Sequence, residues 1–98
     1  MVSYTNQLKF DRRAAFIEKL VSSPNLAIAL LLIPSRSADI LRWRFGMDGH
    51  EKHTRRQVAE RLGLSVARIN QLEVKALVQL EHPSRASQWM GGINDQAY

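Results

Sequence analysis

The chain has 98 residues, which is enough for one small domain and too short for a multidomain enzyme. It contains no cysteine, which excludes disulfide frameworks, cysteine-ligated zinc and thiol catalysis. Fourteen Lys and Arg residues against nine Asp and Glu give a formal charge of +5 and a pI near 10.2, which favours a polyanionic partner, most commonly nucleic acid.

The N-terminal part predicts a helix and carries no secretion signal, because residues 1–10 are polar. Within residues 11–21, apolar side chains recur at helical spacing, with charged residues between them. The longest apolar run, residues 26–33, has eight residues, far below the roughly 20 that a membrane helix needs. We therefore expect a cytoplasmic protein with no membrane partner.

Two prolines divide the next segment into short helices. The first lies in a Ser-Ser-Pro-Asn break, after which residues 26–33 predict a short helix buried on most sides. After the second proline, Ser35 or Ser37 is expected to cap a helix that runs to about Phe45. Gly46 is expected to end that helix in the left-handed conformation that glycine adopts without penalty.

Residues 55–74 predict a helix-turn-helix. Thr54 and Gln57 form a T-x-x-Q capping box, Gly63 supplies the turn, and Ser65 is expected to cap a longer second helix. A small residue, Ala59, stands where the two helices would cross. The expected core that fixes their angle comprises Val58, Leu62, Leu64, Ile69 and Leu72. An ordinary helical hairpin with the same turn is the alternative.

The predicted fold is all-α, a small bundle of about five helices that contains the helix-turn-helix. We expect an N-terminal extension with one helix at 1–24, the main domain at 25–85 and a flexible C-terminal tail at 86–98, with Pro83 stopping the last helix. Trp89 and Met90 are unusual in a solvated tail, so we expect them to dock either on a partner, which we favour slightly, or on the surface of this domain itself.

A distinctive motif lies in the middle of the chain, where residues 33–49 read I-P-S-R-S-A-D-I-L-R-W-R-F-G-M-D-G. This stretch resembles region 4 of the bacterial sigma-70 family, whose pattern is close to L-P-x-R-E-x-x-I-L-R-x-R-F-G-L-D-G. His82-Pro83-Ser84-Arg85 ends the similarity as in the family. The resemblance covers about residues 25–85, in register and without gaps.

The resemblance implies double-stranded DNA as partner, at the −35 promoter element, and docking on the β flap of RNA polymerase. It places the start of the second helix in the major groove. The residues expected to face bases are Ser65, Val66, Ala67, Asn70 and Gln71. The residues expected to face phosphates are Arg42, Arg55, Arg56, Arg68 and Lys75.

The expected base-contacting stretch departs from the family. Primary sigma factors usually carry Arg-Glu-Arg-x-Arg-Gln at residues 66–71, whereas this chain has Val-Ala-Arg-Ile-Asn-Gln. Arg pairs with guanine and Glu with cytosine, each contact giving roughly 1–3 kcal/mol of discrimination, so a target other than the usual −35 hexamer is expected. Residues 65–82 are also formally neutral, which leaves the excess positive charge on the flanking helices.

Two other functions stay open. One is a regulator that binds RNA polymerase or a sigma factor and no longer recognises the promoter. The other is an autonomous repressor or activator that forms a homodimer through its N-terminal helix. No catalytic arrangement is visible, and His50 and His53 are three residues apart instead of the four of a zinc-protease helix, so we predict no enzyme, no metal and no cofactor.

The length leaves no room for the second domain with which a sigma factor opens promoter DNA. The chain is either a fragment or a free-standing region 4 module; its Met1 and its distinct C-terminal tail favour a complete small protein. It would act at the bacterial nucleoid, encoded by a bacterium or by a phage.

Overall fold

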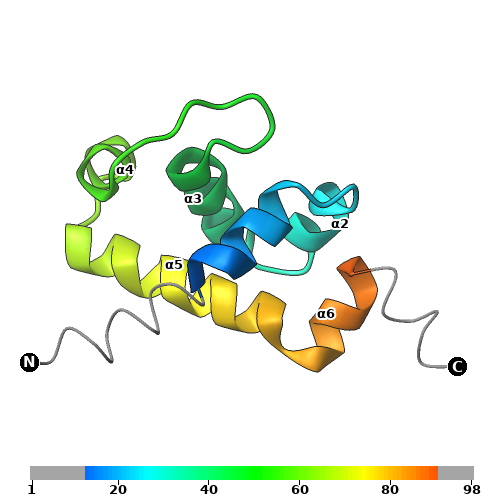
Figure 1. Ribbon diagram of the computed structural model, residues 1–98. Helices are drawn as coiled ribbons and strands as arrows, with labels where there is room; N and C mark the ends of the chain where they lie inside the picture. Colours follow the sequence, from blue (N-terminus) through cyan, green and yellow to red (C-terminus); the bar gives the residue numbers. More distant parts are fainter. Residues whose placement is uncertain (1–12, 91–98) are drawn as a thin grey trace, which may run out of the picture.

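The computed structural model describes residues 13–90, which form six helices and no strand. The longest helix lies along one side of the molecule, with the first helix of the helix-turn-helix near one of its ends and the two shortest labelled helices near the other (Figure 1). The all-α prediction is confirmed. A helix over residues 13–21 is followed by α2 (Leu26–Leu31), α3 (Ser35–Phe45), α4 (Arg55–Leu62), α5 (Val66–Glu81) and α6 (Pro83–Trp89).

The ends of α4 and the start of α5 form as the sequence predicts. The Thr54 hydroxyl accepts a hydrogen bond from the Gln57 amide at 3.1 Å, and the Gln57 side chain accepts one from the Thr54 amide at 2.8 Å. Ser65 accepts from the Arg68 amide at 3.0 Å. Gly63 ends α4 at a φ of +68°, a left-handed conformation that most side chains disfavour. These caps hold α4 and α5 at a tight turn.

The predicted cap of α3 is wrong. The N-cap residue is Pro34, and no side chain caps this helix. The proline ring holds φ at −57°, and the helix begins at the next residue. Ser35 and Ser37 therefore lie inside the first turn, beyond the cap position, and Ser37 is buried. At the other end, Gly46 closes α3 at a φ of +67°, as predicted.

The interior consists of two neighbouring clusters of buried side chains. The larger cluster joins the N-terminal helix to α2, α3, α5 and α6, with Leu20, Leu41, Leu77 and Leu80 fully buried. The smaller cluster joins α3, α4 and α5 through Ile40, Val58, Ala59 and Ile69. Helix α3 thus contributes to both clusters and connects the helix-turn-helix to the rest of the molecule.

The N-terminal helix packs into the larger cluster. Leu20 is fully buried, and Phe16, Ile17 and Val21 pack against the same cluster. Its apolar side is therefore occupied within the chain, and the homodimer expected through this helix gains no support from the described residues. Residues 13–21 share their core with the main domain, so that part of the predicted 1–24 extension is not structurally separate.

Residues 86–90 do not belong to a flexible tail. Pro83 occupies the first turn of α6, where its missing N–H is tolerated, so it starts a helix as well as following the end of α5. Trp89 is 1% exposed, its indole N–H donates to the Leu80 carbonyl at 3.1 Å, and its ring meets Phe16 edge-on at 5.7 Å between centroids. Of the two contacts expected for Trp89, the slightly favoured one to a partner is therefore wrong, and the one to this domain itself is correct. Residues 91–98 of the predicted tail lie outside the described residues.

Helix α2 is more exposed than the sequence predicts. Ala29 and Leu30 are buried, whereas Ile28 is 45% and Leu31 81% exposed. A helix of six residues makes fewer than two turns, and this one packs mainly against α3 and α6 among the labelled helices. Its outer side consequently remains apolar and uncovered. Within residues 13–90, no helix combines the length and the apolar composition that crossing a membrane requires.

Candidate nucleic-acid interface

The helix-turn-helix is held by the smaller core cluster. The Leu64 amide donates to the Ala59 carbonyl at 3.0 Å across the turn, and Ala59 is almost fully buried between the helices. Leu62, Leu64 and Leu72 pack around this cluster, as predicted. Helix α3 adds Ile40 and Trp43, so the angle between α4 and α5 depends on three helices. This third support was not assigned from the sequence pattern.

The first two turns of α5 present the predicted base-facing residues to solvent. Four of them, Val66, Ala67, Asn70 and Gln71, are exposed, while Ile69 on the same turns is fully buried. Residues three and four apart on a helix are neighbours, so these four side chains form one continuous surface. The fifth, Ser65, is also exposed, but its hydroxyl already accepts the capping hydrogen bond of α5. Base contact by these residues stays a prediction.

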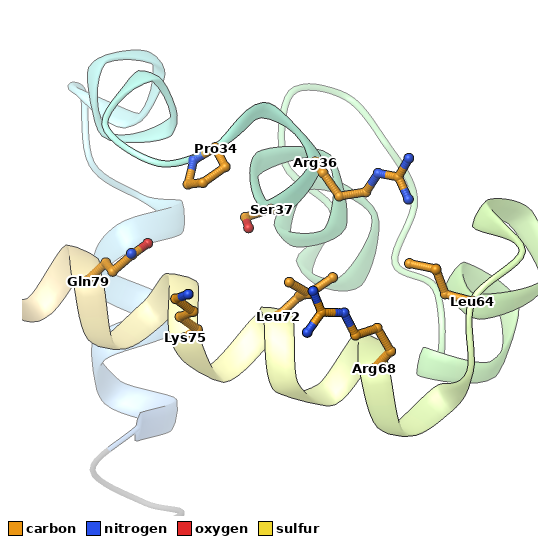
Figure 2. Close-up of a pocket in the computed structure, with 8 residues that line it drawn as sticks. All are labelled: Pro34, Arg36, Ser37, Leu64, Arg68, Leu72, Lys75 and Gln79. Carbon is orange, nitrogen blue, oxygen red and sulfur yellow. The ribbon is translucent and has the colours of Figure 1, made fainter.

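A groove of about 370 Å³ between α3 and α5 carries three cationic side chains (Figure 2). Arg68 and Lys75 project from α5, and Arg36 comes from the first turn of α3. None of the residues that line this groove is acidic. We call Arg36, Arg68 and Lys75 the cationic groove. Arg36 was not among the residues predicted from the sequence, because it becomes part of this groove only through the packing of α3 beside α5.

Two of the five predicted phosphate-facing residues are already paired with acids. Arg42 donates to Asp39 at 2.9 Å and to Asp48 at 3.0 Å, which fixes the turn after α3. Arg55 donates to the carboxylate of Glu73. Arg56 is exposed and forms no ion pair within residues 13–90. Contact with phosphate is therefore easier for Arg56 than for the two paired arginines.

Glu73 changes the charge of the helix surface. Its side chain is 4% exposed and accepts hydrogen bonds from Arg44 at 2.8 Å and from Arg55 at 3.2 and 3.0 Å. This carboxylate is therefore neutralised inside the molecule. The exposed part of α5 from its start to Lys75 carries two cations and no acid, so the sequence-based count of a neutral helix does not describe its surface.

Comparison with known proteins agrees with this geometry. The profile of the family described as Sigma-70, region 4 matches residues 29–82, which include all of α3, α4 and α5. The chain belongs to the sigma-70 region 4 family. That family is a DNA-binding regulatory domain of transcription and not a catalytic family, and it interacts with DNA and RNA polymerase.

Two relatives are RNA polymerase sigma factors. The chain is 41% identical over 56 residues to the RNA polymerase sigma factor SigA of Listeria monocytogenes serovar 1/2a, and equally to that of Listeria innocua serovar 6a. Each match covers 57% of this chain and 15% of the sigma factor. The chain thus corresponds to a small part of these relatives. The helix over residues 13–21 and α6 lie outside the segment that the family profile matches.

Proposed function

We propose that this chain recognises double-stranded promoter DNA with a base preference different from that of primary sigma factors. The observation that carries this proposal is the exposed surface of Val66, Ala67, Asn70 and Gln71 beside the acid-free cationic groove. The start of α5 enters the major groove, and the cations at its side neutralise backbone phosphates. Affinity and base preference then come from different side chains of one surface.

The chemistry of the exposed side chains defines the preference. Val66 and Ala67 offer only apolar contacts, which suit the methyl group of thymine. Asn70 and Gln71 carry carboxamides, which match the donor and acceptor pair of adenine in the major groove. None of these residues provides the bidentate guanine contact of an arginine. The resulting preference is for A·T pairs at the positions that these residues meet.

Phosphate binding rests on the unpaired cations. Arg36, Arg68 and Lys75 line one groove, and Arg56 adds an exposed guanidinium on the first turn of α4. Each phosphate contact releases bound counterions, so affinity falls steeply as salt concentration rises. Arg42 and Arg55 contribute less, because breaking their ion pairs with Asp39, Asp48 and Glu73 offsets the gain.

Selection of bound sequences from random DNA tests this proposal. The chain is incubated with a random duplex library at two salt concentrations, and the enriched sequences are compared for wild type, Asn70→Ala and Glu81→Ala. We expect an A·T preference that Asn70→Ala relaxes at one position, while the change at the exposed Glu81, at the far end of α5, leaves it intact. A flat profile with a steep salt dependence would mean phosphate contact without base recognition.

We also propose that the chain docks on the β flap of RNA polymerase. The exposed side chains of Ile28 and Leu31 support a protein contact, and α2 lies at the end of the molecule away from α4 (Figure 1). DNA and polymerase then occupy opposite ends. Pull-down with an isolated β-flap fragment tests this docking: Leu31→Ser should reduce recovery, and Val78→Ser, an equally polar change at an exposed valine of α5, should not.

The two experiments together separate the remaining functions. Binding to the β flap without any sequence enrichment in the DNA selection supports a polymerase-binding regulator that no longer recognises the promoter. DNA preference without flap recovery contradicts the docking proposal and leaves an independent DNA-binding protein.

A further inference from the structure

A second recess lies on another side of α5. It has a volume of about 450 Å³ and is bounded by the N-terminal helix, the end of α3, the start of α4 and the middle of α5. Asn70, Glu73 and Val74 line it from α5. At 100° per residue these positions face away from Arg68 and Lys75, so the recess is distinct from the cationic groove.

The charges around this recess are not balanced. Arg13, Arg44 and Arg55 line it, and Glu73 is its only acidic lining residue. Glu73 is already shared by Arg44 and Arg55. One Nη atom of Arg13 is buried without a hydrogen-bond partner, the only such side-chain atom among the described residues. A buried donor without an acceptor is costly, and a guanidinium is the group that binds phosphate and carboxylate best.

The rest of the wall is apolar. Ala14 and Ile17 line it from the N-terminal helix, Phe45 from the end of α3 and Val74 from α5. A recess of several hundred Å³ with an apolar wall and a few convergent polar groups is typical of small-molecule sites. These apolar side chains offer no hydrogen bond or charge to the phosphates that recur along a DNA backbone. The combination fits a compact organic anion instead.

We propose that this recess binds a small organic anion, whose phosphate or carboxylate meets Arg13 beside the Arg44 and Arg55 pair and whose apolar body lies against Ile17, Phe45 and Val74. The site depends on the helix over residues 13–21, which lies outside the family profile's match. The site therefore includes residues outside the segment that the family profile matches. This inference does not rest on the proposed promoter recognition, although Asn70 borders both surfaces.

Titration of the full ¹⁵N-labelled chain with phenyl phosphate, followed by amide chemical shifts, tests the proposal without DNA. We expect saturable shifts at Phe45, Asn70 and Val74. Inorganic phosphate should bind more weakly because it lacks the apolar body, and phenol should not bind because it lacks the charge. Absence of saturable shifts, or shifts centred on Arg36 and Arg68, would overturn the proposal.

Two variants and one control locate the anion. Arg13→Ala should weaken phenyl phosphate binding at least tenfold, and Asn70→Asp, at an exposed position that tolerates the change, should abolish it by adding a negative charge to the recess. Arg36→Ala also removes one positive charge, but from the cationic groove, and should leave phenyl phosphate binding unchanged. Equal effects of the two arginine variants would indicate unspecific attraction and contradict the site.

A DNA-binding measurement distinguishes a small organic anion from a backbone phosphate of DNA as the group that Arg13 binds. If phenyl phosphate fails to bind while Arg13→Ala lowers affinity for duplex DNA and its salt dependence, the recess is a phosphate contact of the DNA interface, and the small-anion proposal is wrong. Failure of the chain to bind DNA has no bearing on the phenyl phosphate result.

Discussion

Arg55 and Glu73 join the start of α4 to the middle of α5 through two hydrogen bonds of 3.2 and 3.0 Å. Arg44 of α3 donates to the same buried carboxylate and, through another nitrogen, to the carbonyl of His53. One carboxylate thus connects three helices. The position of the exposed surface of α5 relative to α3 depends on this connection.

Replacing Glu73 with Gln should lower the free energy of unfolding by about 3 kcal/mol. The change keeps the volume of the side chain but removes the charge that offsets two arginines, and breaking a buried ion pair from one side is strongly destabilising. Urea denaturation measures the loss. Glu81→Gln removes the same charge from an exposed position of α5 and should cost less than about 0.5 kcal/mol. Equal losses would mean that the buried pairs contribute nothing specific.

Replacing Trp89 with Ala should cost roughly 3–5 kcal/mol in unfolding free energy. The change empties the place of a fully buried aromatic side chain and removes its edge-on contact with Phe16. The comparison is Gln88→Ala on the adjacent, exposed position of α6, which should change stability by less than about 0.5 kcal/mol. If the tryptophan variant melts like wild type, α6 does not belong to the core.

Replacing Arg68 or Lys75 with Ala should reduce the salt dependence of DNA binding. Each lost phosphate contact lowers the slope of log K against log salt concentration by about 0.9. Fluorescence anisotropy with a labelled duplex at several salt concentrations measures the slope. Lys19→Ala removes an equal charge from an exposed position of the N-terminal helix and should leave the slope unchanged. The phosphate assignment fails if all three variants alter the slope alike.

Restoring the usual family residues on α5 should restore preference for the −35 hexamer of primary sigma factors. The triple variant Val66→Arg, Ala67→Glu and Asn70→Arg recreates the stretch Arg-Glu-Arg-x-Arg-Gln, and all three positions are exposed, so the fold should persist. Each new bidentate contact adds roughly 1–3 kcal/mol of discrimination. Competition binding between the hexamer duplex and a scrambled duplex measures the gain. Equal affinity for both duplexes would mean that the sequence preference is set outside these positions.

Local sequence patterns predicted much of the helix-turn-helix. Caps and glycine turns depend on residues within four positions of each other, so Thr54, Gln57, Gly63 and Ser65 could be interpreted without the fold. Helical periodicity likewise identified the buried face of α5. Pro83 was predicted only to stop α5. It also begins α6, and the local sequence does not distinguish a proline that ends one helix from a proline that begins the next.

Long-range packing explains what the patterns missed. Trp89 is buried by residues such as Phe16 that lie far from it in sequence, so composition alone favoured a tail. Arg36 joins Arg68 only because α3 packs beside α5. The recess that Arg13 lines exists because the N-terminal helix packs onto the core instead of extending from it.

The sequence by itself determined the helical class, the helix-turn-helix and the family, because these depend on local spacing and on motifs. It also determined the net charge of +5. The distribution of that charge was decided by the tertiary structure, because a count cannot distinguish a buried Glu73 from an exposed Glu81. Folding pairs the buried Glu73 with Arg44 and Arg55, so the acid no longer offsets the cations at the exposed start of α5, which stays positive.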